Sequence, residues 1–209
     1  MRASMPASSS TAWAAEPDFM AELPVKLFKH AEAWDAWLVT NGESSSGLWL
    51  RLAKKGATLQ SIGYPEVLEV ALCHGWIDGQ RKSFDEQSFL QKFTHRGPSS
   101  IWSKINRDKV LALIELGRMR PAGHAAIERA RTNGRWDGAY DSHRTAAPAA
   151  DLQAALDRNP KAKAFFATLD SQNRYAVLFR IQTAKKAETR QRRIETFVAM
   201  LARHEKLHP

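Results

Sequence analysis

The stretch that decides the fold is residues 75–106, GWIDGQRKSFDEQSFLQKFTHRGPSSIWSKIN. Residues 76–83 and 88–94 alternate in the manner of strands, and residues 84–87 join them as a turn. Period-two alternation places four side chains on one face of the first strand: Trp76, Asp78, Gln80 and Lys82. We therefore expect the two strands to form part of a small antiparallel sheet.

Helices are expected on both sides of these strands. Apolar residues at helical spacing, with Gly and Asn-Gly stops, predict helices at about residues 31–39, 65–74, 106–116 and 121–132. We expect Asn106 to cap the third of them. Two extended segments, near residues 25–28 and 48–52, complete an α+β fold in which the small sheet packs with helices.

The C-terminal part of the chain is expected to be all-helical. Residues 141–150 are small and polar, with Pro148, and indicate a linker. The residues that follow predict four helices, which begin at Asp151, Asn159, Asp170 or Ser171, and near Ala187. We therefore divide the chain into a disordered leader at 1–24, an α+β domain at 25–140, the linker, and a helical module at 151–209.

The composition is that of a basic protein. Among 209 residues, 31 Lys and Arg stand against 22 Asp and Glu, a formal charge of +9. This charge favours encounters with nucleic acid, anionic lipid or acidic ligands without naming one. The single cysteine, Cys73, excludes an internal disulfide and fits a reducing compartment. No apolar run is long enough to predict a membrane span, and the leader lacks the apolar core of a secretory signal, so we expect a cytoplasmic protein.

The same 75–106 stretch holds the best candidate ligand site. Three aromatic side chains, one carboxylate and several cationic donors lie close together in sequence, and we predict a pocket formed by Trp76, Asp78, Arg81, Lys82, Phe93, Arg96, Trp102 and Asn106. The two tryptophans would be stacking walls, the cations would bind an anionic group, and Asp78 and Asn106 would orient it. In the alternative, the tryptophans are core, Asp78 pairs with Arg81 in a surface bridge worth under about 1 kcal/mol, and Asn106 is only a cap.

A second candidate is the basic run near the C terminus. Its members are Lys185, Lys186, Arg190 and Arg193, and the two arginines share one face of the predicted helix. They could contact the phosphates of nucleic acid. A solvated helix face is the favoured alternative, because no helix-turn-helix or zinc-finger spacing accompanies the charge.

No metal or cofactor site is predicted. Residues 204–208, HEKLH, match the metalloprotease helix pattern, but they lie at the end of the sequence without a third ligand, so we interpret the match as chance. The glycine spacing at 42–47 lacks the lysine of a phosphate-binding loop, and no G-x-S-x-G or C-x-x-C motif occurs. Whether the protein is an enzyme stays open, and a non-enzymatic role is favoured.

Two blocks resemble the YdeI/OmpD-associated family, also called bacteriocin-protection proteins. The first is ALCHGWIDGQRKSFDEQSFLQKFTHRGPSSIWSKINRDKV at 71–110, followed by GRMRPAG at 117–123. The second is LDSQNRYAVLFRIQTAKKAETRQRRIETFVAML at 169–201. The resemblance implies protection against bacteriocins or cationic antimicrobial peptides, and it identifies no catalytic residue.

Three functions follow from these observations. The first is the non-enzymatic protection that the resemblance implies; because a +9 protein repels cationic peptides, we expect an indirect role through an anionic ligand or an envelope component. The second is a nucleic-acid-associated basic protein. The third is a small-anion binder or an enzyme that uses the cluster between Trp76 and Asn106, with Asp78 as its general base. The oligomeric state is left open.

Overall fold

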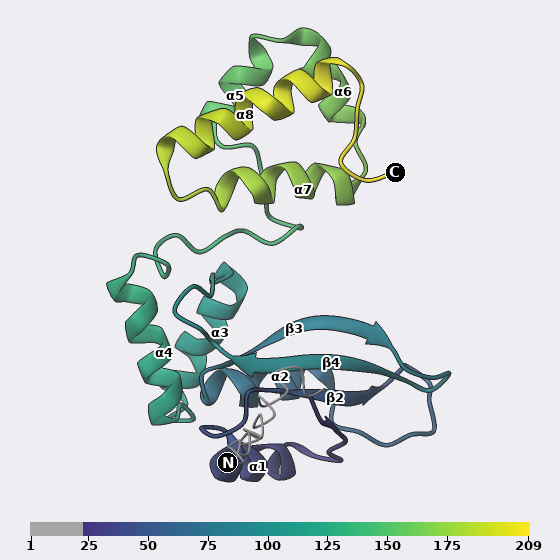
Figure 1. The fold of residues 1–209 in the computed structure, drawn as a ribbon, viewed down its shortest axis with the longest axis vertical. Coiled ribbons are helices and arrows are strands. Elements are labelled where there is room, and N and C mark those ends of the chain that lie inside the picture. Colours follow the sequence, from purple (N-terminus) through teal and green to yellow (C-terminus); the bar gives the residue numbers. More distant parts are fainter. Residues whose placement is uncertain (1–22) are drawn as a thin grey trace, which may run out of the picture.

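The computed structural model describes residues 23–209, so the leader predicted at 1–24 lies almost wholly outside the described residues. The described chain has two lobes joined by an extended segment (Figure 1). The N-terminal lobe (residues 23–140) holds the sheet and helices α1–α4. The C-terminal lobe (residues 150–209) holds helices α5–α8. An α+β part followed by an all-helical part confirms the predicted fold class.

Four strands form one sheet in the order β1-β2-β4-β3. They are β1 (Val25–Lys26), β2 (Leu48–Ala53), β3 (Trp76–Ser83) and β4 (Ser88–His95). The pairs β2–β4 and β3–β4 are antiparallel as predicted, but β1 lies parallel to β2, so the sheet is mixed. The physical reason is the connection: α1 (Ala31–Asn41) carries the chain back before β2 begins, as parallel neighbours require.

Alternation along β3 is interrupted by a bulge. Asp78 lies opposite Phe93 and Arg81 opposite Gln91, so two residues of β3 face one residue of β4. The extra residue shifts Arg81 onto the face that Trp76 and Asp78 occupy, where the period-two pattern had placed Gln80 and Lys82. The predicted grouping of Lys82 with Trp76 and Asp78 is therefore wrong.

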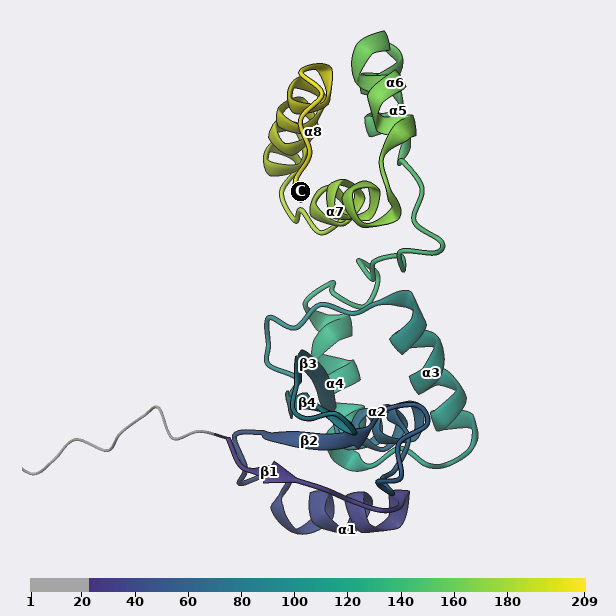
Figure 2. The same cartoon turned by 90° about the vertical axis from the view of Figure 1, so that its right-hand side faces the viewer.

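The sheet buries one face against the helices of its lobe. Besides α1 these are α2 (Tyr64–Cys73), α3 (Lys104–Glu115) and α4 (Pro121–Thr132). Figure 2 shows α1 below the sheet, with α3 and α4 rising toward the other lobe. The core that they enclose includes Trp34, Leu48, Leu50, Val67, Trp76 and Phe93, each fully buried.

The C-terminal lobe has a core of its own. Its helices are α5 (Ala150–Asp157), α6 (Pro160–Thr168), α7 (Ser171–Gln182) and α8 (Ala187–Ala202). The buried side chains at its centre include Leu152, Leu156, Phe166, Ile181, Ile194 and Leu201, and none of them belongs to the core of the N-terminal lobe. Within residues 23–209, no helix combines the length and the apolar character that crossing a bilayer requires.

Two of the predicted N-caps are wrong, because their helices begin at other residues. Ser103, not Asn106, is the N-cap of α3: its Oγ accepts a hydrogen bond from the Asn106 backbone N–H at 3.1 Å. Asp151 lies inside the first turn of α5, which begins after Ala149. Asn159 and Asp170 are caps as predicted, each accepting a bond from a backbone N–H three residues later. Asp151 instead uses its carboxylate to pair with Arg190 of α8.

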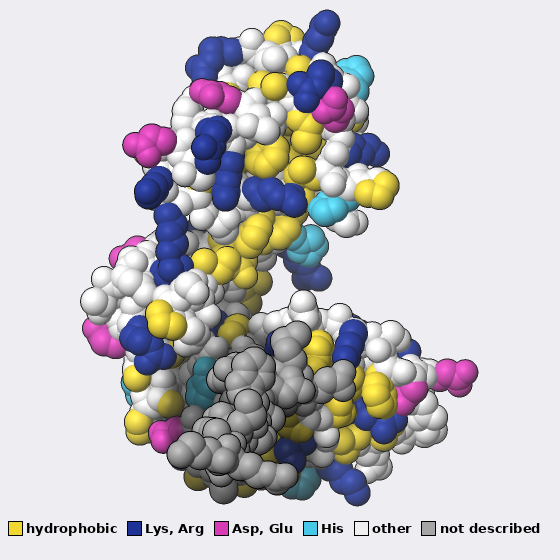
Figure 3. Space-filling view, viewed as in Figure 1, with side chains coloured by type: hydrophobic (Ala, Val, Ile, Leu, Met, Phe, Trp, Pro, Cys, Tyr) yellow, Lys and Arg dark blue, Asp and Glu magenta, His cyan; other side chains and the backbone are white. Residues whose placement is uncertain are grey.

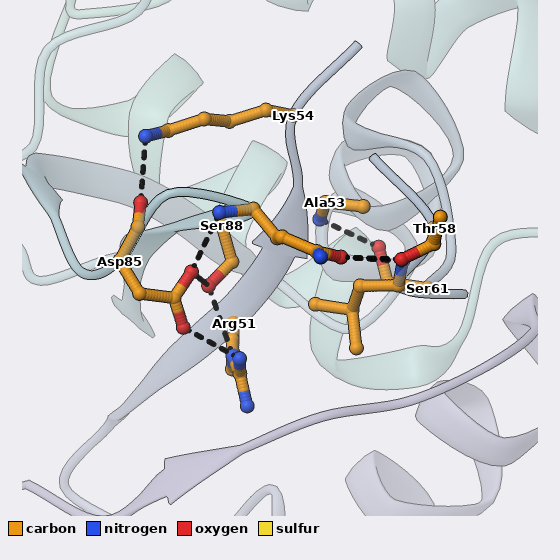
Figure 4. A network of polar contacts seen from close by, with 9 residues as sticks. Arg51, Ala53, Lys54, Thr58, Ser61, Asp85 and Ser88 are labelled. Atoms are coloured by element: carbon orange, nitrogen blue, oxygen red, sulfur yellow. Dashed lines mark hydrogen bonds and ion pairs between the residues drawn. The ribbon is translucent and has the colours of Figure 1, made fainter. Parts of the chain in front are cut away.

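The turn between β3 and β4 is fixed to β2 by a polar network (Figure 4). The Asp85 carboxylate accepts hydrogen bonds from Ser88 Oγ at 2.6 Å and from Arg51 Nη2 at 2.6 Å. Lys54 Nζ donates to the Asp85 backbone carbonyl at 2.6 Å. The Ser88 bond is the main cause of a lowered pKa at Asp85, which keeps the carboxylate ionised. These hydrogen bonds hold the turn of the β3–β4 hairpin in position, at the end of the hairpin that lies away from the second lobe.

Candidate functional site

The structure does not bring the eight predicted pocket residues together around one hollow. Trp76 and Phe93 are both fully buried in the sheet core. The Trp76 ring lies edge-on to Trp34 and Trp37, with centroids 6.1 and 6.0 Å away. A ring enclosed in this way has no face left for a ligand, so the predicted role of Trp76 as a stacking wall is wrong.

The polar members of the predicted pocket are divided among different neighbours. The Tyr64 hydroxyl donates to Asp78 Oδ2 at 2.8 Å, and partial burial together with the Asp78 charge raises the pKa of Tyr64. Arg81 does not pair with Asp78; its guanidinium lies over the Phe89 ring at 3.7 Å. Lys82 Nζ lies over Trp49, 4.4 Å from the ring centroid, on the other face of the sheet. Asn106 is half-buried in the first turn of α3.

Arg96 is the member with an unusual environment. It is only 4 % exposed, and its guanidinium carbon lies over the Trp102 ring, 3.6 Å from the ring centroid. Nη1 donates to the Ile101 carbonyl at 3.2 Å, but Nε and Nη2 are buried with no hydrogen-bond partner among the described residues. Buried charges are normally paired, and leaving buried donors unpaired costs free energy. Arg96 is therefore a buried group with two nitrogens that residues 23–209 leave without a hydrogen-bond partner.

Burial lowers the pKa of Arg96 to about 10, although the Asp78 and Tyr140 charges act in the opposite direction. The group stays protonated at neutral pH, because even this value is far above 7. No carboxylate lies within ion-pair distance of Arg96 among the described residues. The guanidinium group of Arg96 is therefore chemically suited to bind an anion.

The segment that carries Arg96 is fixed at both ends. The Arg96 backbone N–H donates to the Gly75 carbonyl at 2.9 Å, just after β4 ends. Trp102 packs against Trp136 with ring centroids 5.1 Å apart, and its carbonyl accepts from the Tyr140 N–H at 2.9 Å. The guanidinium is thus positioned by the end of a strand and by a tryptophan that precedes α3.

Two more arginines meet Arg96 at a small hollow. Arg129 comes from α4 and Arg135 from the turn after it, and the hollow has a volume of about 10 Å³. Arg135 Nε is also buried without a partner among residues 23–209. The remaining lining residues, Gly97, Pro98, Ser100, Trp102, Ala126, Ala130 and Asn133, include no Asp or Glu. We call this site the arginine hollow. Three guanidinium groups with no lining carboxylate make it a site suited to anions.

Sequence reasoning found Arg96 and Trp102 but missed Arg129 and Arg135. Both missed residues lie more than thirty positions away, at the end of α4 and in an irregular turn. Their spacing matches no helical or strand period that would link them with Arg96. Arg129 and Arg135 come close to Arg96 only because α4 packs beside the segment between β4 and α3.

Only two of the four side chains in the basic run near the C terminus are available to contact a partner. Arg190 forms two bonds to the Asp151 carboxylate, Nε to Oδ2 at 2.6 Å and Nη2 to Oδ1 at 2.8 Å, and its Nη1 donates to the Ile181 carbonyl at 3.1 Å. Arg193 donates to the Arg180 carbonyl. Lys185 and Lys186 are exposed. Lys and Arg side chains are spread over the face of this lobe shown in Figure 3, among hydrophobic ones. The two arginines therefore tie helices together, and the predicted four-residue contact surface is reduced to its lysines.

The HEKLH sequence does not form a metal-binding helix. Helix α8 ends at Ala202, and His204 has a left-handed backbone with φ of 60°. The His204 ring stacks on Phe165 at 4.9 Å, and Glu205 pairs with Arg203 at 2.8 Å. Without a helical turn the two histidines cannot present their nitrogens on one face, as the metalloprotease pattern needs.

Comparison with known protein families finds a different family model for each lobe. Residues 146–204 match the family model described as Bacteriocin-protection, YdeI or OmpD-Associated. This part of the chain is thus similar to the YdeI/OmpD-associated family. Residues 26–126 match another model, a domain of unknown function (DUF8412). No curated protein and no solved structure matches the chain.

The two matches refine the resemblance seen in the sequence. The block at 169–201 lies within the YdeI/OmpD-associated domain, so that recognition is confirmed. The block at 71–110 lies within the DUF8412 match instead. Arg96 and Arg129 therefore belong to a different part of the molecule from the YdeI/OmpD-associated domain, and the role implied by that family name does not by itself extend to the arginine hollow.

Proposed function

We propose that this protein is a non-enzymatic binder of a small anion, which it holds at the arginine hollow. The observation that carries the proposal is the buried Arg96 guanidinium, with two nitrogens that have no partner among the described residues, beside Arg129 and Arg135. Guanidinium groups bind carboxylate and phosphate oxygens through paired, charge-assisted hydrogen bonds. An anion here would satisfy donors that the described chain leaves without partners.

We further propose that anion binding is the route by which the protein contributes to protection against bacteriocins or cationic antimicrobial peptides. The role is suggested by the description of the family model that residues 146–204 match. The formal charge of +9 argues against direct capture of a cationic peptide, since like charges repel through solvent. Binding an anionic component of the cell, in the cytoplasm or at the envelope, fits this charge.

Calorimetric titration with inorganic phosphate at low ionic strength tests the binding. The wild type should bind phosphate, and Arg96→Met should weaken binding about 10- to 100-fold, the usual effect of losing charge-assisted hydrogen bonds. The melting temperature of Arg96→Met without ligand should equal or exceed that of the wild type, because an unpaired buried cation is removed. Arg135→Met provides a second variant in case Arg96→Met does not fold.

Arg131→Met is the matched control. Arg131 lies on α4 beside Arg129, but it is exposed, pairs with Glu128 at 3.9 Å and does not line the hollow. It should bind phosphate as the wild type does. A wild type that binds no phosphate, or an Arg96→Met variant that binds it undiminished, would contradict the proposal. Cells that express Arg96→Met at wild-type levels should also survive a cationic peptide less well than cells that express the wild type.

A further inference from the structure

The arginine hollow is too small to hold a whole polyatomic anion. Its volume of about 10 Å³ matches the space needed for a single water-sized group. One oxygen of an anion can enter it and reach the guanidinium groups. The rest of the ligand must then lie in whatever space adjoins the hollow.

The adjoining space is a pocket between the two lobes, with a volume of about 250 Å³. It shares Asn133 and Arg135 with the arginine hollow, so the two are neighbours. Its N-terminal-lobe wall includes Ile101, and its other wall comes from the segment between α7 and α8, where Thr183, Ala184 and Lys185 lie. We call it the inter-lobe pocket.

The charges around both spaces have one sign. Lys185 adds a cation to the three arginines of the hollow, and no Asp or Glu within residues 23–209 lines either space. A carboxylate carries one negative charge, whereas a phosphate monoester carries about −1.5 to −2 at neutral pH and offers three oxygens. The doubly charged group matches the surplus of cations better.

The lobes are held in place around this pocket by Asp141. The Asp141 N–H donates to Gln182 Oε1 at 3.1 Å, and its carbonyl accepts from the Tyr175 hydroxyl at 3.0 Å. Its carboxylate pairs with Lys104 of α3 at 2.8 Å. One residue thus connects α3 to α7, and this connection keeps the walls of the inter-lobe pocket facing each other.

We propose that the ligand is a phosphate monoester that bridges the two lobes. One phosphate oxygen enters the arginine hollow between Arg96 and Arg135, and the organic group lies in the inter-lobe pocket against Ala184. This inference rests on the proposed function, because it needs the arginine hollow to bind an anion. It adds the chemical class of the ligand and a contribution from the YdeI/OmpD-associated domain.

The test compares inorganic phosphate with ribose 5-phosphate on the full chain by calorimetric titration. Ribose 5-phosphate should bind the wild type at least tenfold more tightly than inorganic phosphate does. Ala184→Phe fills only the part of the inter-lobe pocket beside the segment between α7 and α8, where the organic group would lie. The part at Arg135, where the phosphate group itself lies, stays open. The substitution should therefore remove this tenfold advantage while binding of inorganic phosphate stays the same. Ala154→Phe, on an exposed position of α5, should behave as the wild type does toward both probes.

The outcomes separate this inference from the proposed function. If inorganic phosphate binds at Arg96 but ribose 5-phosphate gains nothing, or if Ala184→Phe has no effect, the bridging ligand is wrong and the anion site stands. If neither probe binds the wild type, both proposals are wrong. If ribose 5-phosphate binds and Arg96→Met does not weaken it, the ligand occupies another site and the inference is overturned.

Discussion

At the scale of single residues, the chain uses arginine in two opposite ways. Each of the three guanidinium nitrogens of Arg190 donates a hydrogen bond, two of them to a carboxylate and one to a carbonyl. Arg96 is more deeply buried, yet two of its nitrogens have no partner among the described residues. The first arrangement stabilises a fold, whereas the second costs stability and is expected where a ligand completes the site. Identical side chains therefore differ in role through their neighbours alone.

The Arg190–Asp151 pair gives a prediction about pH. Hydrogen bonds from Arg190 are the main cause of the lowered pKa of Asp151, which is ordinarily 3.8. A carboxyl group whose pKa is lower in the folded state stabilises the fold above 3.8, and this stabilisation is lost as the pH falls through the folded-state pKa. Since Asp151 is 43 % exposed, Asp151→Asn should cost only about 0.5–1 kcal/mol at pH 7.

Urea denaturation at several pH values measures this effect. The difference between Asp151→Asn and the wild type should shrink as the pH falls below 3.8. Glu188→Gln is the control, because Glu188 lies in the first turn of α8 without a hydrogen-bond partner among residues 23–209, and it should change stability far less. A difference that stays constant down to pH 2 would show that the ion pair is not its cause.

At the scale of elements, the N-terminal lobe depends on α4 lying close to the end of α2. Arg120, the N-cap of α4, donates from its backbone to the Cys73 carbonyl at 3.1 Å and from its side chain to Asp35 of α1 at 2.8 Å. His74 Nε2 lies 2.8 Å from the same Asp35 carboxylate. The polar contacts join three helices, and they place Arg129, two and a half turns further along α4, at the arginine hollow.

Gly123 makes this close approach possible, which gives the second prediction. A methyl group at this position would lie 2.2 Å from the Cys73 carbonyl oxygen, which is backbone and cannot move aside alone. Gly123→Ala should therefore lower the free energy of unfolding by about 1–3 kcal/mol or more, as overpacking does. Urea titration measures the loss.

Gly97→Ala is the matched control, because a methyl group there meets nothing within 4 Å. It should leave stability nearly unchanged. A Gly123→Ala variant as stable as the wild type would mean that α4 and α2 do not approach each other as the structure has them, and the position of Arg129 would then change too.

At the scale of the whole molecule, the two lobes have cores with no shared residue, and among residues 23–209 no helix of the second lobe packs extensively on an element of the first. Asp141 supplies the connections between α3 and α7. Cooperative unfolding requires that losing one core destabilises the other, and the small number of connections makes this coupling weak. We therefore expect the lobes to unfold separately.

Calorimetry with one core substitution in each lobe tests this. Leu50→Ala should lower the melting temperature of the first lobe only, and Leu156→Ala that of the second lobe only. Each should cost its lobe the 2–5 kcal/mol in free energy of unfolding that is typical of a large-to-small change. Both side chains are at most 1 % exposed, so the two variants are matched in burial. A single transition that both substitutions lower equally would show that the lobes form one cooperative unit.

Local sequence determined most of the elements. Helix stops at Gly42 and Asn133, caps at Asn159 and Asp170, and the strand at residues 88–94 all depend on neighbours within a few positions, and the structure has each of them. The parallel direction of β1, the bulge in β3 and the Ser103 cap were not predicted. They depend on how a segment meets a partner that is remote in sequence, or on a choice between two good caps.

The amino-acid sequence by itself determined an α+β part followed by helices, the excess of positive charge and the resemblance of residues 146–204 to a known family, and it placed Arg96 and Trp102 among eight candidate site residues. Only the tertiary structure decided that Trp76 lies in the core, that Arg190 and Arg193 bind within the protein, and that Arg129 and Arg135 join Arg96. The physical reason is that helices and caps follow from local periodicity. Whether a charge is paired depends on atoms that come together only when distant segments pack.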